Sequence, residues 1–427
     1  MQEEFLHFIW KYKKFDIGKA RTTNNLNLFI LDFGNHNHSS GPDFLNAKVE
    51  IDHQLWAGNV EIHIKSSDWY LHRHETDPNY DNVILHVVWE DDIEVFRKDN
   101  STIPTLELKK LVHPDSLQNY KSLLLNGSKK WINCEKDFHF FDDFTMKNWL
   151  ERVYFERLEK KSIKIAEMLK FTENNWEEVL FKLLFRNFGL KLNGDSFESI
   201  ANSINFKVIQ KLGSSPFKME ALFFGQAGLL NKDVDNVYFN SLKSEYQFLK
   251  KKYNLDESTV ISPHFFRLRP DNFPSIRLSQ LSQLYSNIPH LFSEVIKIKN
   301  KKEFYSLFNS STSEFWETHY TFKKEHKGRK KKLTQNFIDL LIINTIVPFK
   351  YSYLKEIGNE EAIEILNLVE QVDQEKNSIV ENFNLLRSKT ATNSAHSQAL
   401  VQLKTEYCDK NACLQCGLGV KLIRGLI

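Results

Sequence analysis

The stretch that decides the fold of the first part of the chain is residues 41–65, GPDFLNAKVEIDHQLWAGNVEIHIK. Apolar and polar residues alternate on both sides of residues 52–53, which is typical of two half-buried strands joined by a tight turn. Outward from this hairpin, residues 26–33 and 83–89 predict further strands, and residues 3–13 predict an amphipathic helix. These elements together predict a sheet domain.

The hairpin arithmetic places particular side chains together. If the turn centres on residues 52–53, the numbers of opposed residues sum to about 105 or 106. Asp43 then faces residue 62 or 63 and lies close to Glu61. Because side chains alternate along a strand, Glu61, His63 and Lys65 share one face.

The rest of the chain has a different periodicity. After residue 142, successive segments place apolar residues at three- and four-residue intervals, separated by turn signals such as Asn193-Gly194-Asp195. We therefore expect an α+β protein. Its α/β sheet domain would cover residues 1–110, a connecting segment residues 111–141, and a larger all-α domain residues 142–427.

Composition excludes several classes of protein. The 427 residues contain 57 Lys plus Arg against 55 Asp plus Glu, so any polyanion site must be a local patch. Apolar runs are too short to predict a membrane span, and the N-terminus lacks the pattern of a signal peptide. Four cysteines are too few for a disulfide scaffold, which favours a reducing cytoplasm.

The hairpin carries the pattern of a metal-dependent hydrolase. Asp43 and Glu61 would hold Mg²⁺ or Mn²⁺ between two carboxylates, with His63 or Lys65 beside them to activate water or balance charge. The pattern resembles the restriction-endonuclease-like nucleases, whose motif is Pro-Asp followed by Asp or Glu, any residue, and Lys. Pro42-Asp43 and Glu61 match that motif, and His63 stands in the place of the Lys.

The resemblance to these nucleases also has implications for the fold and the site. It implies a helix, a three-stranded meander, a second helix and a further strand, with both acidic residues on Mg²⁺. An acidic residue of the first helix often joins such a site, so Glu3 or Glu4 is a candidate.

Histidines are concentrated in the same region, which suggests a competing class of enzyme. Seven of the 15 histidines fall between residues 36 and 86. A Zn²⁺ or Mn²⁺ hydrolase would use His72, His74 and His86 together with Asp43. The alternative is that His86 is a core histidine on a buried strand. The seven are His36, His38, His53, His63, His72, His74 and His86.

A second resemblance covers nearly the whole chain. The segments GPDF, VEIH, SSDW and LHVVW, the region of residues 269–278 and the cysteine-containing tail are similar to an uncharacterised bacterial family, the domain-of-unknown-function 2851 family. This resemblance implies no activity. It implies that the two domains occur as one unit.

The tail has the spacing of a metal site, Cys-x4-Cys-x2-Cys. A fourth ligand would come from Cys134, His139 or His396, and the alternative is a set of buried free thiols. We expect Zn²⁺ or a [4Fe–4S] cluster. The three clustered residues are Cys408, Cys413 and Cys416.

A basic run near the middle of the second domain is a candidate phosphate-binding segment. A solvated loop between helices would have the same composition, and phosphate binding would be distinguished by its dependence on salt. The run contains Lys323, Lys324, Lys327, Arg329, Lys330, Lys331 and Lys332.

These observations lead to one principal hypothesis. We expect a cytoplasmic, metal-dependent phosphodiesterase acting on nucleic acid, with Asp43, Glu61, His63 and Lys65 at its catalytic site. Two alternatives stay open: a non-catalytic scaffold that binds nucleic acid or protein, and a His-rich zinc hydrolase. The sequence leaves the oligomeric state open.

Overall fold

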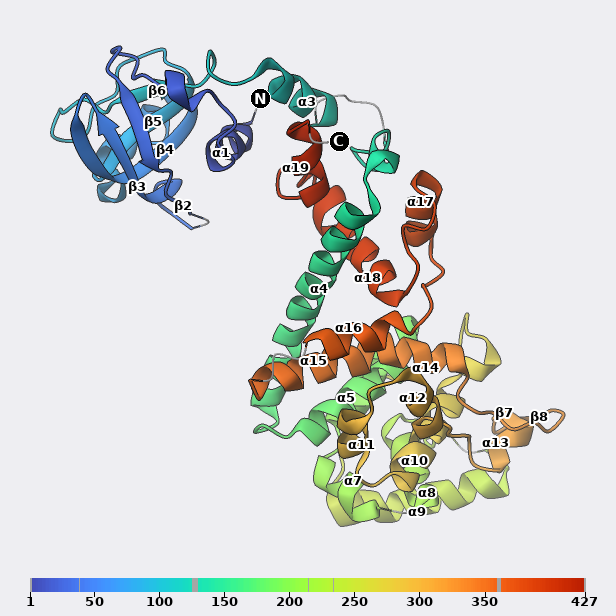
Figure 1. The fold of residues 1–427 in the computed structure, drawn as a ribbon. Coiled ribbons are helices and arrows are strands. Elements are labelled where there is room, and N and C mark those ends of the chain that lie inside the picture. The colour runs from blue at the N-terminus through green and yellow to red at the C-terminus, as the bar shows by residue number, and fades with distance from the viewer. Residues whose placement is uncertain are drawn as a thin grey trace. The chain divides into compact units, whose positions relative to one another are not determined.

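The computed structural model (Figure 1) describes residues 2–37, 39–124, 130–213, 215–232, 234–358 and 362–425. The chain forms two compact units. Unit 1 comprises Met1–Trp149, Leu385–Ser388 and Val401–Ile427, and unit 2 comprises Leu150–Asn384 and Lys389–Leu400. The predicted division placed residues 142–427 in one helical domain, whereas residues 401–427 pack within unit 1.

Unit 1 contains a mixed sheet with the strand order β1-β3-β4-β5-β6, in which β2 is paired to β3 (Figure 1). β1, β3 and β4 are antiparallel, whereas β4, β5 and β6 run parallel. A parallel pair needs a crossover. The one between β4 and β5 contains the short helix α2 (Asp68–Leu71). The strands are β1 (Leu28–Asp32), β2 (Asn35–His36), β3 (Phe44–Ile51), β4 (Gln54–Lys65), β5 (Val83–Glu90) and β6 (Thr105–Glu107).

The turn of the β3–β4 hairpin lies where the alternation predicted it. Asp52 and His53 both have positive φ, 48° and 68°, as a two-residue turn of type I′ requires. The register then shifts between Phe44 and Ala47, where Asn46 adopts a φ of 60°. This β-bulge brings Asp43 level with Glu61 rather than with residue 62 or 63.

Helix α1 (Glu3–Lys11) packs its apolar face on the sheet. Phe5, Leu6 and Ile9 are fully buried in the same core as the inward residues of β3 and β4. Trp10 donates its indole N–H to the carbonyl of Phe33 at 3.0 Å. Helices α3 (Pro114–Leu124) and α19 (Gly417–Ile423) pack against each other and contribute to that core. The C-terminal segment is therefore part of the first unit.

Unit 2 is helical, with a short two-stranded ribbon, so the described residues there are not all-α as predicted. The ribbon is β7 (His319–Thr321) with β8 (Lys324–Glu325). Helix α4 (Asp143–Phe171) begins in unit 1 and continues into unit 2. The other helices are α5 (Trp176–Phe188), α6 (Leu190–Asn202), α7 (Phe206–Leu212), α8 (Pro216–Gln226), α9 (Val237–Tyr253), α10 (Pro274–Asn287), α11 (Leu291–Lys297), α12 (Lys301–Leu307), α13 (Phe315–Thr318), α14 (Gln335–Leu341), α15 (Val347–Glu356), α16 (Ala362–Glu370), α17 (Ser378–Leu386) and α18 (Ser394–Gln402).

One predicted helix boundary was wrong. Asn193, Gly194 and Asp195 lie inside α6 and do not form a turn. The Asn193 side chain bonds the backbone of His264 in both directions, at 2.8 Å each, so it serves a tertiary contact instead. The break comes earlier, between α5 and α6, where Leu190 has a φ of 55°.

One helical stretch has the length and composition of a membrane span. It runs from Gln335 to Glu356 through α14, a π-helical segment (Ile342–Ile346) and α15, and 67% of its most apolar window is buried inside the protein. Pro348 follows the π-helical segment. Such a segment is one way in which a helix accommodates a proline, which has no backbone N–H to donate.

Candidate metal centre

The candidate site is built on one face of β4 and β5. Glu61 and His63 point to that face and are buried, at 5% and 1% exposure. His86 on β5 is paired in register with Glu61 and is also fully buried. Lys65, at the end of β4, is exposed, and its backbone N–H is bonded to Asp68. The structure therefore brings Glu61 and His63 into the site and leaves the Lys65 side chain at the surface.

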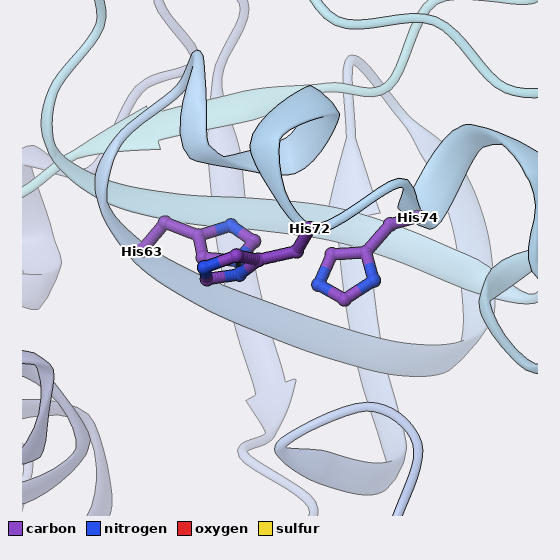
Figure 2. A group of neighbouring side chains, drawn as sticks. All are labelled: His63, His72 and His74. Atoms are coloured by element: carbon purple, nitrogen blue, oxygen red, sulfur yellow. Dashed lines mark hydrogen bonds between the residues drawn. The ribbon is translucent and has the colours of Figure 1, made fainter.

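Two more histidines reach this face from the crossover between β4 and β5. Figure 2 shows the imidazoles of His63, His72 and His74 turned toward one another. Their ligand atoms all lie within 4.8 Å of one another, and among the described residues they form the one such group of His, Cys, Asp or Glu. Ligands of an ion bound at about 2.1 Å lie roughly 3–3.5 Å apart. The 3.1 Å between His63 Nε2 and His72 Nδ1 fits that spacing.

The carboxylate of Glu61 lies beside these imidazoles. Its Oε1 is 3.3 Å from His74 Nε2 and 3.6 Å from His63 Nε2. Its Oε2 accepts the backbone N–H of Asp43 at 3.1 Å, and Asp43 Oδ2 in turn accepts the backbone N–H of Ile62 at 3.0 Å. This reciprocal pair of hydrogen bonds holds the two carboxylates next to each other, as the hairpin arithmetic predicted.

Helix α1 contributes two residues that lie one turn apart. His7 Nε2 is 3.2 Å from Asp43 Oδ2. Glu3 is close enough to Asp43 that burial, together with the Asp43 charge, raises the pKa of the Glu3 carboxyl. Of the two predicted acidic candidates Glu3 therefore belongs to this cluster, whereas Glu4 is exposed. His7 was not among the predicted site residues, although its i, i+4 spacing from Glu3 places both on one helix face.

The electrostatics of the cluster suit a cation. Burial, with the neighbouring Asp43 charge, raises the pKa of Glu61 to about 9. Burial also lowers the pKa of His63 to about 2 and that of His86 to about 3. Imidazoles must be neutral to ligate a metal, and a carboxyl with a raised pKa must release its proton before it can do so. A divalent cation bound here would displace the proton of Glu61 and offset its charge.

His86 is fully buried on β5, as expected for the alternative in which it is a core histidine. It lies outside the three-histidine group, and its Nε2 is 2.8 Å from His63 Nδ1. This contact leaves His63 Nε2 facing His72 and Glu61, which is the usual arrangement of an outer group that orients a ligating imidazole.

The remaining histidines of the region lie outside the three-histidine group. His36 stacks on Phe44, with ring centroids 4.9 Å apart, and its ring lies 5.6 Å from that of His7. His53 in the hairpin turn is 87% exposed. His38 lies outside the described residues.

The basic run includes one residue that cannot contact phosphate. Lys331 is 3% exposed, and its ammonium donates to the backbone carbonyls of Trp316, Glu317 and His319. The prediction was wrong there, because composition alone does not reveal a lysine that caps buried carbonyls. Arg329 is paired with Asp271. The other five, Lys323, Lys324, Lys327, Lys330 and Lys332, are exposed.

Comparison with known proteins identifies a family whose description names no activity. The family model described as Protein of unknown function (DUF2851) matches residues 3–378. No curated protein and no solved structure matches the chain.

Proposed function

The chain belongs to the family described as Protein of unknown function (DUF2851), and because that description assigns no activity, we propose from the site that this protein is a divalent-metal-dependent phosphodiesterase acting on nucleic acid. One observation carries the proposal. The imidazoles of His63, His72 and His74 converge beside the paired carboxylates of Glu61 and Asp43.

The donor set favours some cations over others. Imidazole nitrogen suits Zn²⁺ and similar transition-metal ions, carboxylate oxygen suits Mn²⁺, and Mg²⁺ prefers oxygen ligands in a strict octahedron. Three imidazoles with Glu61 and Asp43 therefore fit Mn²⁺ or Zn²⁺ better than the Mg²⁺ that the two carboxylates alone would suggest.

The chain order around the site supports hydrolysis of a phosphodiester. Helix α1, the antiparallel strands β1 to β4, the short helix α2 and the parallel strand β5 follow one another, with Asp43 directly before β3 and Glu61 within β4. The resemblance to restriction-endonuclease-like nucleases implies this order. In those enzymes a lysine stands where this chain has His63, whose pKa is lowered to about 2 by burial. We infer that His63 acts as a neutral ligand and not as a positive charge.

A basic groove in unit 1, which also includes Asp16 and Asp115 and shares no residue with the histidine site, is a candidate surface for a polyanionic substrate. The groove has a volume of about 1000 Å³. Positive side chains lining it attract phosphate through counterion release. Lys19 is paired with Asp16 at 2.8 Å, so the others carry the attraction. The basic residues of the lining are Lys13, Lys14, Lys19, Lys110 and Arg424.

Each residue then has a stated role. Glu61 and the three imidazoles would hold the ion, Asp43 would complete its oxygen ligands, and His7 would hold Asp43 in place. When bound, the ion supplies Lewis-acid charge for a phosphoryl oxygen. His86 keeps the His63 ring oriented.

The test uses full-length protein stripped of metal and then supplied with Mn²⁺, Zn²⁺ or Mg²⁺. We expect cleavage of labelled single- or double-stranded nucleic acid with Mn²⁺ or Zn²⁺, and its loss in the double variant Asp43→Asn, Glu61→Gln. His53→Ala, in the exposed hairpin turn, is the matched histidine control for His63→Ala. Cleavage that survives in the double variant would contradict the proposal.

A zinc hydrolase acting on small substrates is the second candidate, because the three-imidazole group alone fits zinc. The two candidates differ in their response to salt. Cleavage of nucleic acid through the basic groove would weaken steeply as salt rises, whereas hydrolysis of a small neutral ester would not.

A further inference from the structure

The four cysteines of the chain come together in unit 1, although one is far from the others in sequence. Cys134 lies in the segment after α3. Cys408 ends a short π-helical segment (Leu403–Cys408), Cys413 lies in the following turn, and Cys416 directly precedes α19. All four are free thiols.

Their proximity shows in their contacts. Cys134 packs against the core cluster that contains Cys413, and the side chain of its neighbour Asn133 reaches the Cys413 sulfur. Cys413 and Cys416 are 9% and 7% exposed. Thiols held together out of water in this way are poor nucleophiles, and a bound cation would offset their shared charge.

The residues around the cysteine sulfurs are closely packed. The Asn133 side chain donates to Cys413 Sγ at 3.3 Å. A Cβ on Gly419 would lie 2.2 Å from the carbonyl oxygen of Cys413, so only glycine fits there. N–H groups directed at sulfur are the contacts that tune metal-bound thiolates.

The distances between the sulfurs distinguish a single zinc ion from an iron–sulfur cluster. Four thiolates on one zinc ion, each at about 2.3 Å, would lie about 3.8 Å apart. Among the described residues the one group of three ligands within 4.8 Å of one another consists of histidines, so no three of these sulfurs are that close. An iron–sulfur cluster distributes four thiolates over two or four iron atoms, and at most two share one iron.

We propose that Cys134, Cys408, Cys413 and Cys416 hold an iron–sulfur cluster that fastens the C-terminal segment to the segment after α3. The Cys-x4-Cys-x2-Cys spacing with one distant cysteine is among those that such clusters use. The centre is separate from the histidine site and does not depend on the proposed phosphodiesterase activity.

The first experiment measures iron, acid-labile sulfide and zinc in full-length protein purified without oxygen. We expect iron and sulfide in equal amounts, with a broad visible absorbance that is lost on oxidation. Two iron atoms per chain would indicate [2Fe–2S] and four would indicate [4Fe–4S]. One zinc with no iron, or four freely reactive thiols with neither metal, would overturn the proposal.

Variants then test the ligand set. Cys134→Ser, Cys413→Ser and Cys416→Ser should each reduce the iron content to a small fraction of the wild-type value. Gln415→Ser, at an exposed position between two of the cysteines, should keep it. Full iron content in Cys134→Ser would overturn the four-cysteine assignment. If the serine variants fail to fold, the metal content of the wild-type protein decides.

Discussion

At the scale of single residues, the site depends on pairs of side chains that fix each other. His86 orients His63, and His7 lies against Asp43. Strand alternation and the hairpin turn were enough to predict that Asp43 lies close to Glu61 and that Glu61 and His63 share a face, because period two assigns a face without any knowledge of the fold. It could not predict His7, which comes from a different element. Strand alternation also could not show that the Lys65 side chain is exposed at the end of β4.

The contact between His7 and Asp43 leads to a prediction about metal affinity. His7→Ala should weaken Mn²⁺ binding by about tenfold without changing the number of ions bound, because loss of an outer partner typically costs 10- to 100-fold in affinity. Isothermal titration calorimetry on metal-free protein measures both quantities.

The control variant for His7→Ala changes an exposed charged residue that follows the site residues on β4. Lys65→Ala should leave Mn²⁺ affinity within about twofold, since an exposed charge outside the ligand set contributes little. A loss in Lys65→Ala as large as that in His7→Ala would show that the lysine reaches the ion after all.

At the scale of elements, the β-bulge in β3 decides which residue meets Glu61. The hairpin turn could be predicted because Asp52 and His53 interrupt the alternation. The bulge could not, because one extra residue with positive φ leaves no clear mark in a pattern of apolar and polar residues. Asn46 is a residue type that tolerates this conformation, and its backbone N–H is bonded to the Asn59 side chain at 3.2 Å.

Substitution of Asn46 tests the bulge. Asn46→Gly should change the free energy of unfolding by less than about 0.5 kcal/mol, whereas Asn46→Val should lower it by about 1–2 kcal/mol, because a β-branched residue at positive φ is strained. Urea denaturation measures both variants. Equal free energies of unfolding for the two variants would mean that a β-branched side chain at residue 46 does not strain the bulge.

In unit 2, helix α8 carries a buried carboxyl that ties several elements together. Glu220 accepts hydrogen bonds from the side chains of Tyr238, Ser279, Ser313 and Trp316, at 2.5 to 3.3 Å. Burial is the largest effect on its pKa and raises it above the ordinary value of 4.5. The sequence pattern could not predict this position, because a single Glu within an apolar helix has the same spacing whether or not donors surround it.

The raised pKa of Glu220 predicts how stability changes with pH. The folded protein keeps the proton at pH values where the unfolded chain has lost it, so this group's contribution is present at low pH and is lost as pH rises above 4.5. Glu220→Gln removes the titration. Relative to wild type, the variant should therefore gain stability as pH rises from about 5 to about 8. Urea denaturation of both proteins at the two pH values tests this. A difference in the free energy of unfolding between variant and wild type that is the same at both pH values would contradict it.

At the scale of the whole molecule, the order of a sheet-containing part and a helical part could be predicted from the change of periodicity. The return of residues 401–427 to unit 1 could not. Apolar spacing shows that α19 has a face to bury but does not say which element covers it. In the structure Val420 and Ile423 join the core that also contains Phe5 of α1 and Tyr120 of α3.

This arrangement predicts that a single charge in α19 weakens the sheet far away in sequence. Ile423 is 1% exposed, so Ile423→Asp would bury an unpaired carboxylate and should lower the stability of unit 1 by about 3 kcal/mol or more. Hydrogen exchange should then accelerate in α1 and in β3 to β5, and stay unchanged in α8 and α10 of unit 2. Gln415→Asp adds the same charge at an exposed position and should leave both units protected. Equal loss of protection in both units would mean that they unfold as one, so the division into two units would not describe the protein's stability.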